Sequence, residues 1–188
     1  MKSHKGQVCF PGGMCEQSDK NVLETALREA NEEIGINREN ITYIAQLYPL
    51  ITSNKTLVTP VITFFEDNDY EPKINKNEVD LVFRLPTDRF IFKENHKHES
   101  YKIEKTGDEY YVHYFKDILN DKEITTWGVT AIICILASSI LHSRAPEFKV
   151  DPIYDFDKTK INDYLKFSLI RNINRIDYYE QIKTGKKK

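Results

Sequence analysis

Apolar residues return every three or four positions between residues 20 and 34, as they do on one face of an α-helix. This stripe consists of Leu23, Leu27, Ala30 and Ile34. Gly35 follows directly, and glycine is the usual residue just past the C-terminal end of a helix. The pattern therefore predicts an amphipathic helix that ends at Ile34 and packs its apolar side inward.

Five short runs rich in β-branched and aromatic residues predict strands. They cover residues 6–10, 41–48, 57–65, 79–85 and 110–115. Prolines follow the first, second and fourth runs directly, and a proline lacks the N–H that a sheet ladder needs. The most apolar run, residues 129–141, predicts a buried core helix rather than a membrane span, which needs ~20 residues. Residues 164–173 predict a further, peripheral helix.

The order of these elements lacks the regular strand–helix alternation of a doubly wound sheet. No internal repeat or low-complexity linker divides the chain, so we expect one domain over residues 1–188, with 151–188 as a peripheral extension. The expected fold class is α+β. A length of 188 residues is enough for a sizeable core.

Charge and cysteine content narrow the choice of partners. The chain has 27 basic and 29 acidic residues and a formal net charge of -2, so we expect no nucleic-acid partner. An anionic ligand must then be held by local groups. The three cysteines have no metal-ligand spacing and form no evident disulfide framework, which is typical of a reducing compartment. His96 and His98 are expected in a polar loop rather than in a metal site.

The first predicted helix carries an unusual concentration of acid. Glu29 and Glu33 lie one turn apart on the same side, and Glu32 adjoins them. Like charges so placed destabilise an isolated helix by about 0.2–0.5 kcal/mol per pair. A hard divalent cation bound between the carboxylates makes the same arrangement favourable. Arg28, one residue ahead, can orient a carboxylate. A solvated helix face is the alternative, and the glycine loop before the helix favours a ligand site.

Residues 28–36, Arg-Glu-Ala-Asn-Glu-Glu-Ile-Gly-Ile, resemble the end of the Nudix box, G-x5-E-x7-R-E-U-x-E-E-x-G-U, where U is apolar. Gly13 is identified with the first glycine of the box. Five residues later, Asp19 stands where the box has glutamate, and the loop from there to Arg28 is one residue longer. The resemblance implies an α/β/α sandwich with a mixed sheet flanked by helices.

The segment Ser-His-Lys-Gly-Gln-Val-Cys-Phe-Pro-Gly-Gly at residues 3–13 is similar to the upstream motif of the coenzyme A diphosphatase branch of that family. Further similarity to its peroxisomal animal members continues to about residue 150. Members of this branch have a strand and basic residues before this motif. We therefore expect an N-terminally shortened domain that lacks its first strand.

The resemblance implies that Glu29 and Glu33 bind Mg²⁺ or Mn²⁺. Glu32 either assists the metal, directly or through a water, or is the general base, and Glu78 is the other candidate base or else a surface residue at the start of a strand. Coenzyme A, and possibly its thioesters, would be cleaved to adenosine 3′,5′-bisphosphate and 4′-phosphopantetheine. The residues expected to contact this small-molecule substrate are Lys2, His4, Gly12, Gly13 and Arg28.

Two other functions stay open at this point. One is a Nudix pyrophosphatase acting on another nucleoside diphosphate derivative, and the other is an inactive Nudix module that only binds a ligand. The resemblance implies a peroxisomal location, although no peroxisomal signal ends the sequence, and a cytoplasmic or mitochondrial location is the alternative. We expect no membrane partner, and the sequence does not set the oligomeric state.

Overall fold

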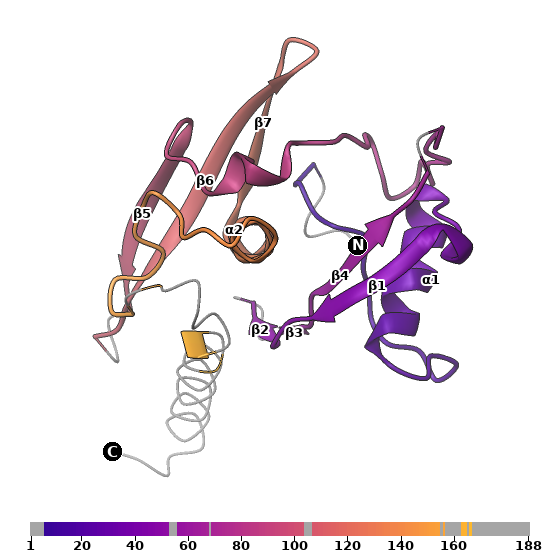
Figure 1. Cartoon of the computed structure of the whole chain (residues 1–188), viewed down its shortest axis with the longest axis horizontal. Helices are drawn as coiled ribbons and strands as arrows, with labels where there is room; N and C mark the ends of the chain where they lie inside the picture. The colour runs from indigo at the N-terminus through magenta and orange to yellow at the C-terminus, as the bar shows by residue number, and fades with distance from the viewer. Residues whose placement is uncertain are drawn as a thin grey trace. The chain divides into compact units, whose positions relative to one another are not determined.

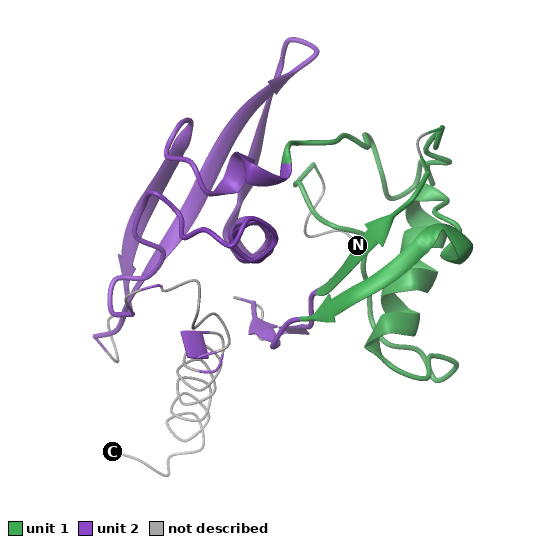
Figure 2. Ribbon diagram, in the orientation of Figure 1, with its two compact units in different colours: residues 1–46, 61–86 green, residues 47–60, 87–188 purple. Residues whose placement is uncertain are grey.

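The computed structural model describes residues 6–52, 56–67, 69–103, 107–154, 156, 163, 164 and 166. The chain divides into two compact units, one of residues 1–46 and 61–86, the other of residues 47–60 and 87–188 (Figure 2). Helices and antiparallel sheets occur together, so the α+β class is confirmed (Figure 1). The organisation as one domain with a peripheral extension at 151–188 stays a prediction.

The first unit is built on helix α1 (Val22–Ile34) and the antiparallel strands β1 (Ile41–Gln46) and β4 (Val61–Phe65). A short 3-10 helix, η1 (Arg38–Asn40), precedes β1. The Asn21 side chain accepts a hydrogen bond from the Glu24 amide and caps the start of α1. Gly35 ends the helix in the left-handed conformation, with φ of 74°. The helix predicted to end at Ile34 is therefore confirmed.

The second unit holds a three-stranded meander of β5 (His96–Lys102), β6 (Glu109–Leu119) and β7 (Lys122–Trp127). Asn120 and Asp121 join the last two strands with φ of 49° and 63°. Two consecutive positive φ values are the mark of a type I′ turn, which suits the twist of a two-residue hairpin. The short strands β2 (Leu50–Ile51) and β3 (Leu57–Val58) pair separately.

Helix α2 (Gly128–Leu141) follows β7 without a loop and packs on β6, β7 and the 3-10 helix η2 (Thr87–Phe90). Its apolar side chains are the core of this unit, as predicted for residues 129–141. The fully buried apolar residues are Ile91, Phe115, Ala131, Ile135 and Leu136. Within the described residues, no helix combines the length and the apolar character that crossing a membrane requires.

Several strand predictions were wrong or incomplete. Residues 6–10 and 79–85 are not strands, and the run at 57–65 divides at Pro60 into β3 and β4. The polar loop expected around His96 and His98 is strand β5, and β7 was also missed. Pairing with neighbours decides strand formation more than local composition does, because β-propensity depends on context. The helix predicted at 164–173 falls mostly outside the described residues.

We expect Ile135→Ala to lower the free energy of unfolding by about 2–5 kcal/mol, because it leaves a cavity in a fully buried site. Urea unfolding followed by the fluorescence of the single tryptophan, Trp127, reports on this unit. Leu141→Ala on the same helix is the matched control, since Leu141 is 49% exposed. Equal losses in both variants would show that the α2 core is misassigned.

Candidate functional site

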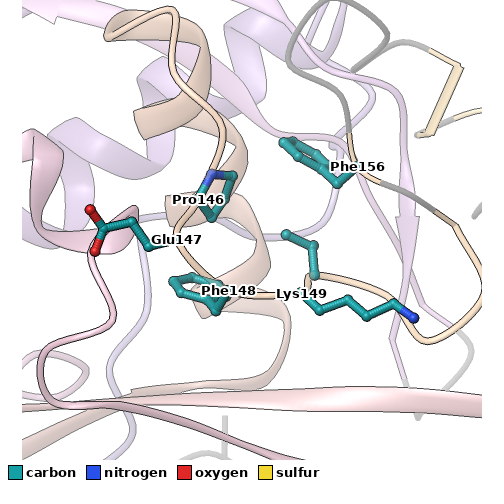
Figure 3. A pocket seen from close by; sticks show the side chains of 6 residues that line it. Pro146, Glu147, Phe148, Lys149 and Phe156 are labelled. Carbon is teal, nitrogen blue, oxygen red and sulfur yellow. The ribbon is translucent and has the colours of Figure 1, made fainter.

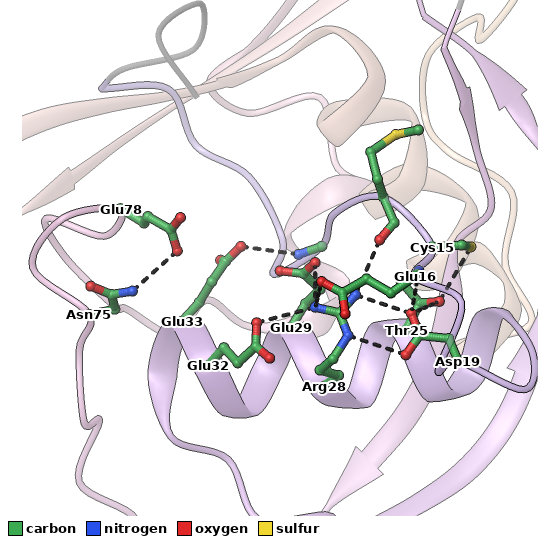
Figure 4. Close-up of polar contacts among 12 residues, drawn as sticks. Cys15, Glu16, Asp19, Thr25, Arg28, Glu29, Glu32, Glu33, Asn75 and Glu78 are labelled. Atoms are coloured by element: carbon green, nitrogen blue, oxygen red, sulfur yellow. Dashed lines mark hydrogen bonds and ion pairs between the residues drawn. The ribbon is translucent and has the colours of Figure 1, made fainter.

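Arg28 is the centre of a polar network on one face of α1 (Figure 4). Its guanidinium has five N–H donors, and each is used by an acceptor of the protein. Nε and Nη2 bind the two carboxylate oxygens of Asp19 at 3.2 and 3.1 Å, and Nη2 also reaches the Met14 carbonyl at 3.1 Å. Nη1 donates to Glu29 Oε1 at 3.0 Å and to Glu32 Oε2 at 3.2 Å. Arg28 therefore fixes both acidic side chains relative to the preceding loop.

Asp19 anchors this network from the loop side. Its Oδ2 accepts hydrogen bonds from the Thr25 hydroxyl at 3.0 Å and from the Glu16 amide at 2.9 Å, in addition to the Arg28 fork. The hydrogen bond from Arg28, followed by the one from the Glu16 backbone, lowers the pKa of Asp19 to about 2. Asp19 is therefore ionised at any physiological pH and balances the charge of Arg28.

The glycine loop lies directly against the acidic face. A Cβ added at Gly13 would lie 2.1 Å from Glu29 Oε1, so the carboxylate occupies the space that any other residue would fill. The Gly12 amide points to Glu33 Oε1 at 3.5 Å, the outer limit of a hydrogen bond. The loop thus cradles two of the three predicted carboxylates with backbone atoms.

The Glu33 carboxylate is partly buried and lies near other acidic side chains. Its pKa is raised above the ordinary value, first by partial burial. The nearby charges of Glu29, Glu78 and Glu32 raise it further, and the Gly12 amide acts in the opposite direction. The site therefore holds more negative charge than its own donors neutralise, which is the condition that attracts a cation.

Glu78 comes to this face from a separate segment. Asn75 Nδ2 donates to Glu78 Oε2 at 3.3 Å, and the Asn75 amide donates to the Glu33 carbonyl at 2.9 Å. The Glu78 side chain lies across from Glu33 in Figure 4. Four carboxylates of the first unit are thus gathered around the end of α1.

The donor set suits a hard divalent cation, which prefers carboxylate and phosphate oxygens. Among the residues that the structure describes, however, no three acidic, histidine or cysteine side chains are placed so that together they could hold a metal ion. Mg²⁺ usually takes one or two carboxylates and completes its shell with water and substrate phosphate. An open arrangement of Glu29 and Glu33 fits that mode of binding.

The structure brings six of the predicted site residues together in the first unit: Gly12, Gly13, Arg28, Glu29, Glu32 and Glu33. Glu78 joins them through Asn75. Lys2 and His4 lie outside the described residues. Because all Arg28 donors are engaged by the protein, its geometry favours the orienting function over direct substrate contact.

Sequence reasoning missed three members of the network: Glu16, Thr25 and Asn75. Asp19 was noted only as a departure from a motif. Hydrogen bonds between a loop and a helix leave no periodic signal in the sequence, and only the motif alignment of Asp19 pointed to this loop. The second unit contains a cavity of about 340 Å³ that no predicted site residue lines (Figure 3). Its lining is Pro146, Glu147, Phe148, Lys149, Val150 and Phe156.

The model of the NUDIX domain family matches residues 1–107. The chain is 38% identical over 149 residues to "Nudix hydrolase 15, mitochondrial" of Arabidopsis thaliana, covering 79% of this chain and 52% of the relative. It is 33% identical over 153 residues to "Peroxisomal coenzyme A diphosphatase NUDT7" of Mus musculus, with shares of 80% and 64%. "Peroxisomal coenzyme A diphosphatase ndx-8" of Caenorhabditis elegans is 35% identical over 161 residues, with shares of 80% and 61%. The chain thus spans between half and two thirds of the length of these relatives.

We expect Gly13→Ala to weaken Mn²⁺ binding about ten- to hundredfold, as is typical when a group that orients a metal ligand is lost. The new Cβ would displace the Glu29 carboxylate, and since that group is the flexible end of a side chain, the melting temperature should change little. Calorimetric titration with Mn²⁺ measures the affinity. Gly12→Ala is the matched control, because a Cβ there meets no atom within 4 Å. Equal Mn²⁺ affinities in the two variants would contradict the inference that the space at Gly13 sets the position of the Glu29 carboxylate.

Proposed function

This chain belongs to the Nudix family, and we propose that it is a Mg²⁺- or Mn²⁺-dependent hydrolase that cleaves the diphosphate linkage of coenzyme A. The family membership predicted from residues 3–36 is confirmed, and it supports pyrophosphohydrolase chemistry on a small molecule. The observation that carries the proposal is the acidic face of α1, where Arg28 holds the Glu29 and Glu32 carboxylates and Gly13 leaves room for Glu29. Two of the relatives bear the name coenzyme A diphosphatase, which supports this substrate.

Glu29 and Glu33 are the proposed metal ligands. Nudix hydrolases generally use divalent metals. When bound, such an ion lowers the pKa of a water molecule and neutralises charge on the diphosphate oxygens. Arg28 keeps the Glu29 carboxylate oriented. Partial burial, and after it the neighbouring carboxylates, raise the pKa of Glu33, and a cation bound there would relieve the repulsion between these carboxylates.

A general base must take the proton of the attacking water, and two side chains are candidates. Glu32 is held by Arg28 at 3.2 Å, and its side chain is 54% exposed. Glu78 approaches from another segment, and among the described residues its carboxylate accepts a hydrogen bond only from the Asn75 side chain, at 3.3 Å. Replacing each by glutamine keeps its size while removing its capacity to accept a proton, so the two variants separate these roles.

Substrate phosphates would approach the glycine loop, where the absence of a Cβ leaves backbone N–H groups accessible. Gly12 and Gly13 are therefore the proposed phosphate contacts among the described residues. Lys2 and His4, which precede the glycine loop in the sequence, are proposed to contribute positive charge to substrate binding. Because the net charge of the chain is -2, recognition of an anion must depend on such local groups.

A second candidate is a Nudix pyrophosphatase with a different nucleoside diphosphate substrate. It is favoured by relatives such as "Nudix hydrolase 15, mitochondrial", whose name gives no substrate. A catalytically inactive ligand-binding module is the non-enzymatic alternative. The presence of Glu29, Glu32 and Glu33 argues against it. The relatives bear mitochondrial, chloroplastic and peroxisomal names, so the compartment of this chain stays a prediction.

We expect Glu33→Gln and Glu29→Gln each to lower kcat about 100-fold or more, because a metal ligand loses its charge. Mg²⁺-dependent release of product measures the effect, with circular dichroism to confirm that the fold persists. Glu24→Gln is the control on the same helix, since Glu24 pairs with Arg38 and lies outside the carboxylate cluster. Near-normal turnover of Glu33→Gln at saturating Mg²⁺ would refute the metal assignment.

We expect the chain to hydrolyse coenzyme A in preference to ADP-ribose, NADH or a nucleoside diphosphate sugar. Mass spectrometry should identify adenosine 3′,5′-bisphosphate and 4′-phosphopantetheine as the products. Higher kcat/KM for one of the other compounds would favour the second candidate. Binding of coenzyme A without any Mg²⁺-dependent turnover would favour the inactive module.

A further inference from the structure

One asparagine connects the end of α1 to the segment that carries Glu78. The Asn75 amide donates to the Glu33 carbonyl at 2.9 Å, and its own carbonyl accepts from the Glu78 and Val79 amides at 3.0 and 2.9 Å. Its side chain is also used at both ends. Oδ1 accepts from the Asn77 amide at 3.2 Å, and Nδ2 donates to Glu78 Oε2 at 3.3 Å. Asn75 thus contacts the helix with its backbone and the Glu78 carboxylate with its side chain.

The segment leading to Asn75 is docked on the same helix end. The Lys73 amide and the Tyr70 hydroxyl both donate to the Ile34 carbonyl, at 3.1 and 2.5 Å. The last carbonyls of a helix lack intrahelical partners, so these bonds satisfy groups that would otherwise need water. Close contact at Gly35 adds to this docking, because a Cβ there would lie 2.6 Å from Lys73 Cβ. The path from α1 to Asn75 is therefore well defined.

Glu78 itself is exposed, and the residues after it are not in a strand. An exposed glutamate keeps most of its rotamer freedom unless a neighbour restrains it. Within the described residues, the Glu78 carboxylate accepts one hydrogen bond, which comes from Asn75. The turn closed by the Asn75 carbonyl sets the backbone of Glu78, and the Asn75 amide group sets its side chain.

We propose that Asn75 is a positioning residue, which holds the Glu78 carboxylate at a fixed place across from Glu33. This inference rests on the proposed function and on Glu78 as the base that takes a proton from the attacking water. Asn75 itself touches neither the substrate nor the reacting atoms. Its contribution is the placement of Glu78 relative to the helix that carries Glu29 and Glu33.

The decisive variant is Asn75→Asp. It keeps the backbone bonds and an oxygen for the Asn77 amide, but it replaces the donor toward Glu78 with a second negative charge. We expect kcat for coenzyme A to fall about tenfold or more, since a misplacement of ~1 Å can cost on the order of 10²-fold. KM and the affinity for Mn²⁺ should stay within about threefold, because Glu29 and Glu33 keep their own contacts.

Asn40→Asp is the matched control. Asn40 Nδ2 donates to Asp67 Oδ2 at 3.0 Å in the same unit, and both asparagines are half-buried. The substitution therefore makes the same chemical change at a carboxylate away from the proposed site. We expect it to leave kcat within about twofold. A loss of kcat equal to that of Asn75→Asp would indicate a general effect on stability and would overturn the proposal.

Asn75→Asp in a Glu78→Gln background tests whether Asn75 affects kcat through Glu78. If Asn75 acts through Glu78, Asn75→Asp should cost less than about twofold once Glu78 has lost its charge. A full tenfold loss in that background would show that Asn75 acts elsewhere and would overturn the proposal. Near-normal kcat of the single variant Asn75→Asp would overturn it as well.

A measurement without substrate or metal completes the test. NMR relaxation of the Glu78 Cγ methylene group should show a loss of about a third or more of its order parameter in Asn75→Asp and no change in Asn40→Asp. Unchanged side-chain order in both variants would show that Asn75 does not hold the Glu78 carboxylate. If the unaltered chain fails to hydrolyse any diphosphate, the proposed function is wrong, and the side-chain order still decides whether Asn75 fixes Glu78.

Discussion

The crowding of negative charge on α1 is the constraint to which the rest of the first unit responds. Three glutamates within two turns repel one another, and the Arg28 guanidinium relieves two of them by donating to Glu29 and Glu32. The Arg28 guanidinium can hold these carboxylates only if a further charge-assisted hydrogen bond fixes the guanidinium itself. Asp19 provides it through both carboxylate oxygens, and it is in turn held by the loop that precedes the helix. The loop and the helix therefore form one electrostatic unit.

The glycine loop and the segment around Asn75 both pack against α1. The first contacts the carboxylates of the helix, and the second binds its backbone. Gly13 allows the first loop to approach until the Glu29 carboxylate fills the place of a side chain. Asn75 binds the last turn through the Glu33 carbonyl and brings Glu78 with it. Glu33 contacts both segments, and partial burial, followed by the charges of its carboxylate neighbours, raises its pKa. The geometry suits a site that is completed by a cation and a phosphate.

The second unit shows a different use of polar groups. His96 Nε2 lies 3.0 Å from His113 Nδ1, and His113 Nε2 lies 2.9 Å from the Val150 carbonyl. Burial is the largest cause that lowers the pKa of both histidines to about 4, so neither is charged at neutral pH. His96 also stacks on Phe148, with ring centroids 3.6 Å apart. These histidines pack as neutral rings within the sheet and its covering segment.

The sequence alone determined the two helices and the family to which the chain belongs. Residues 20–34 and 129–141 carry strong local patterns, and the Nudix motif predicts Arg28, Glu29, Glu32 and Glu33 as site residues. Strands were harder, because the polar run at His96 pairs as a strand while the apolar run at 79–85 does not. Only the tertiary structure decided that Asp19 anchors Arg28 and that Asn75 brings Glu78 to Glu33. The Asn75–Glu33 contact joins residues far apart in the chain, and the Arg28–Asp19 contact crosses from a helix to an irregular loop. Neither propensity nor periodicity records which groups will meet in these ways.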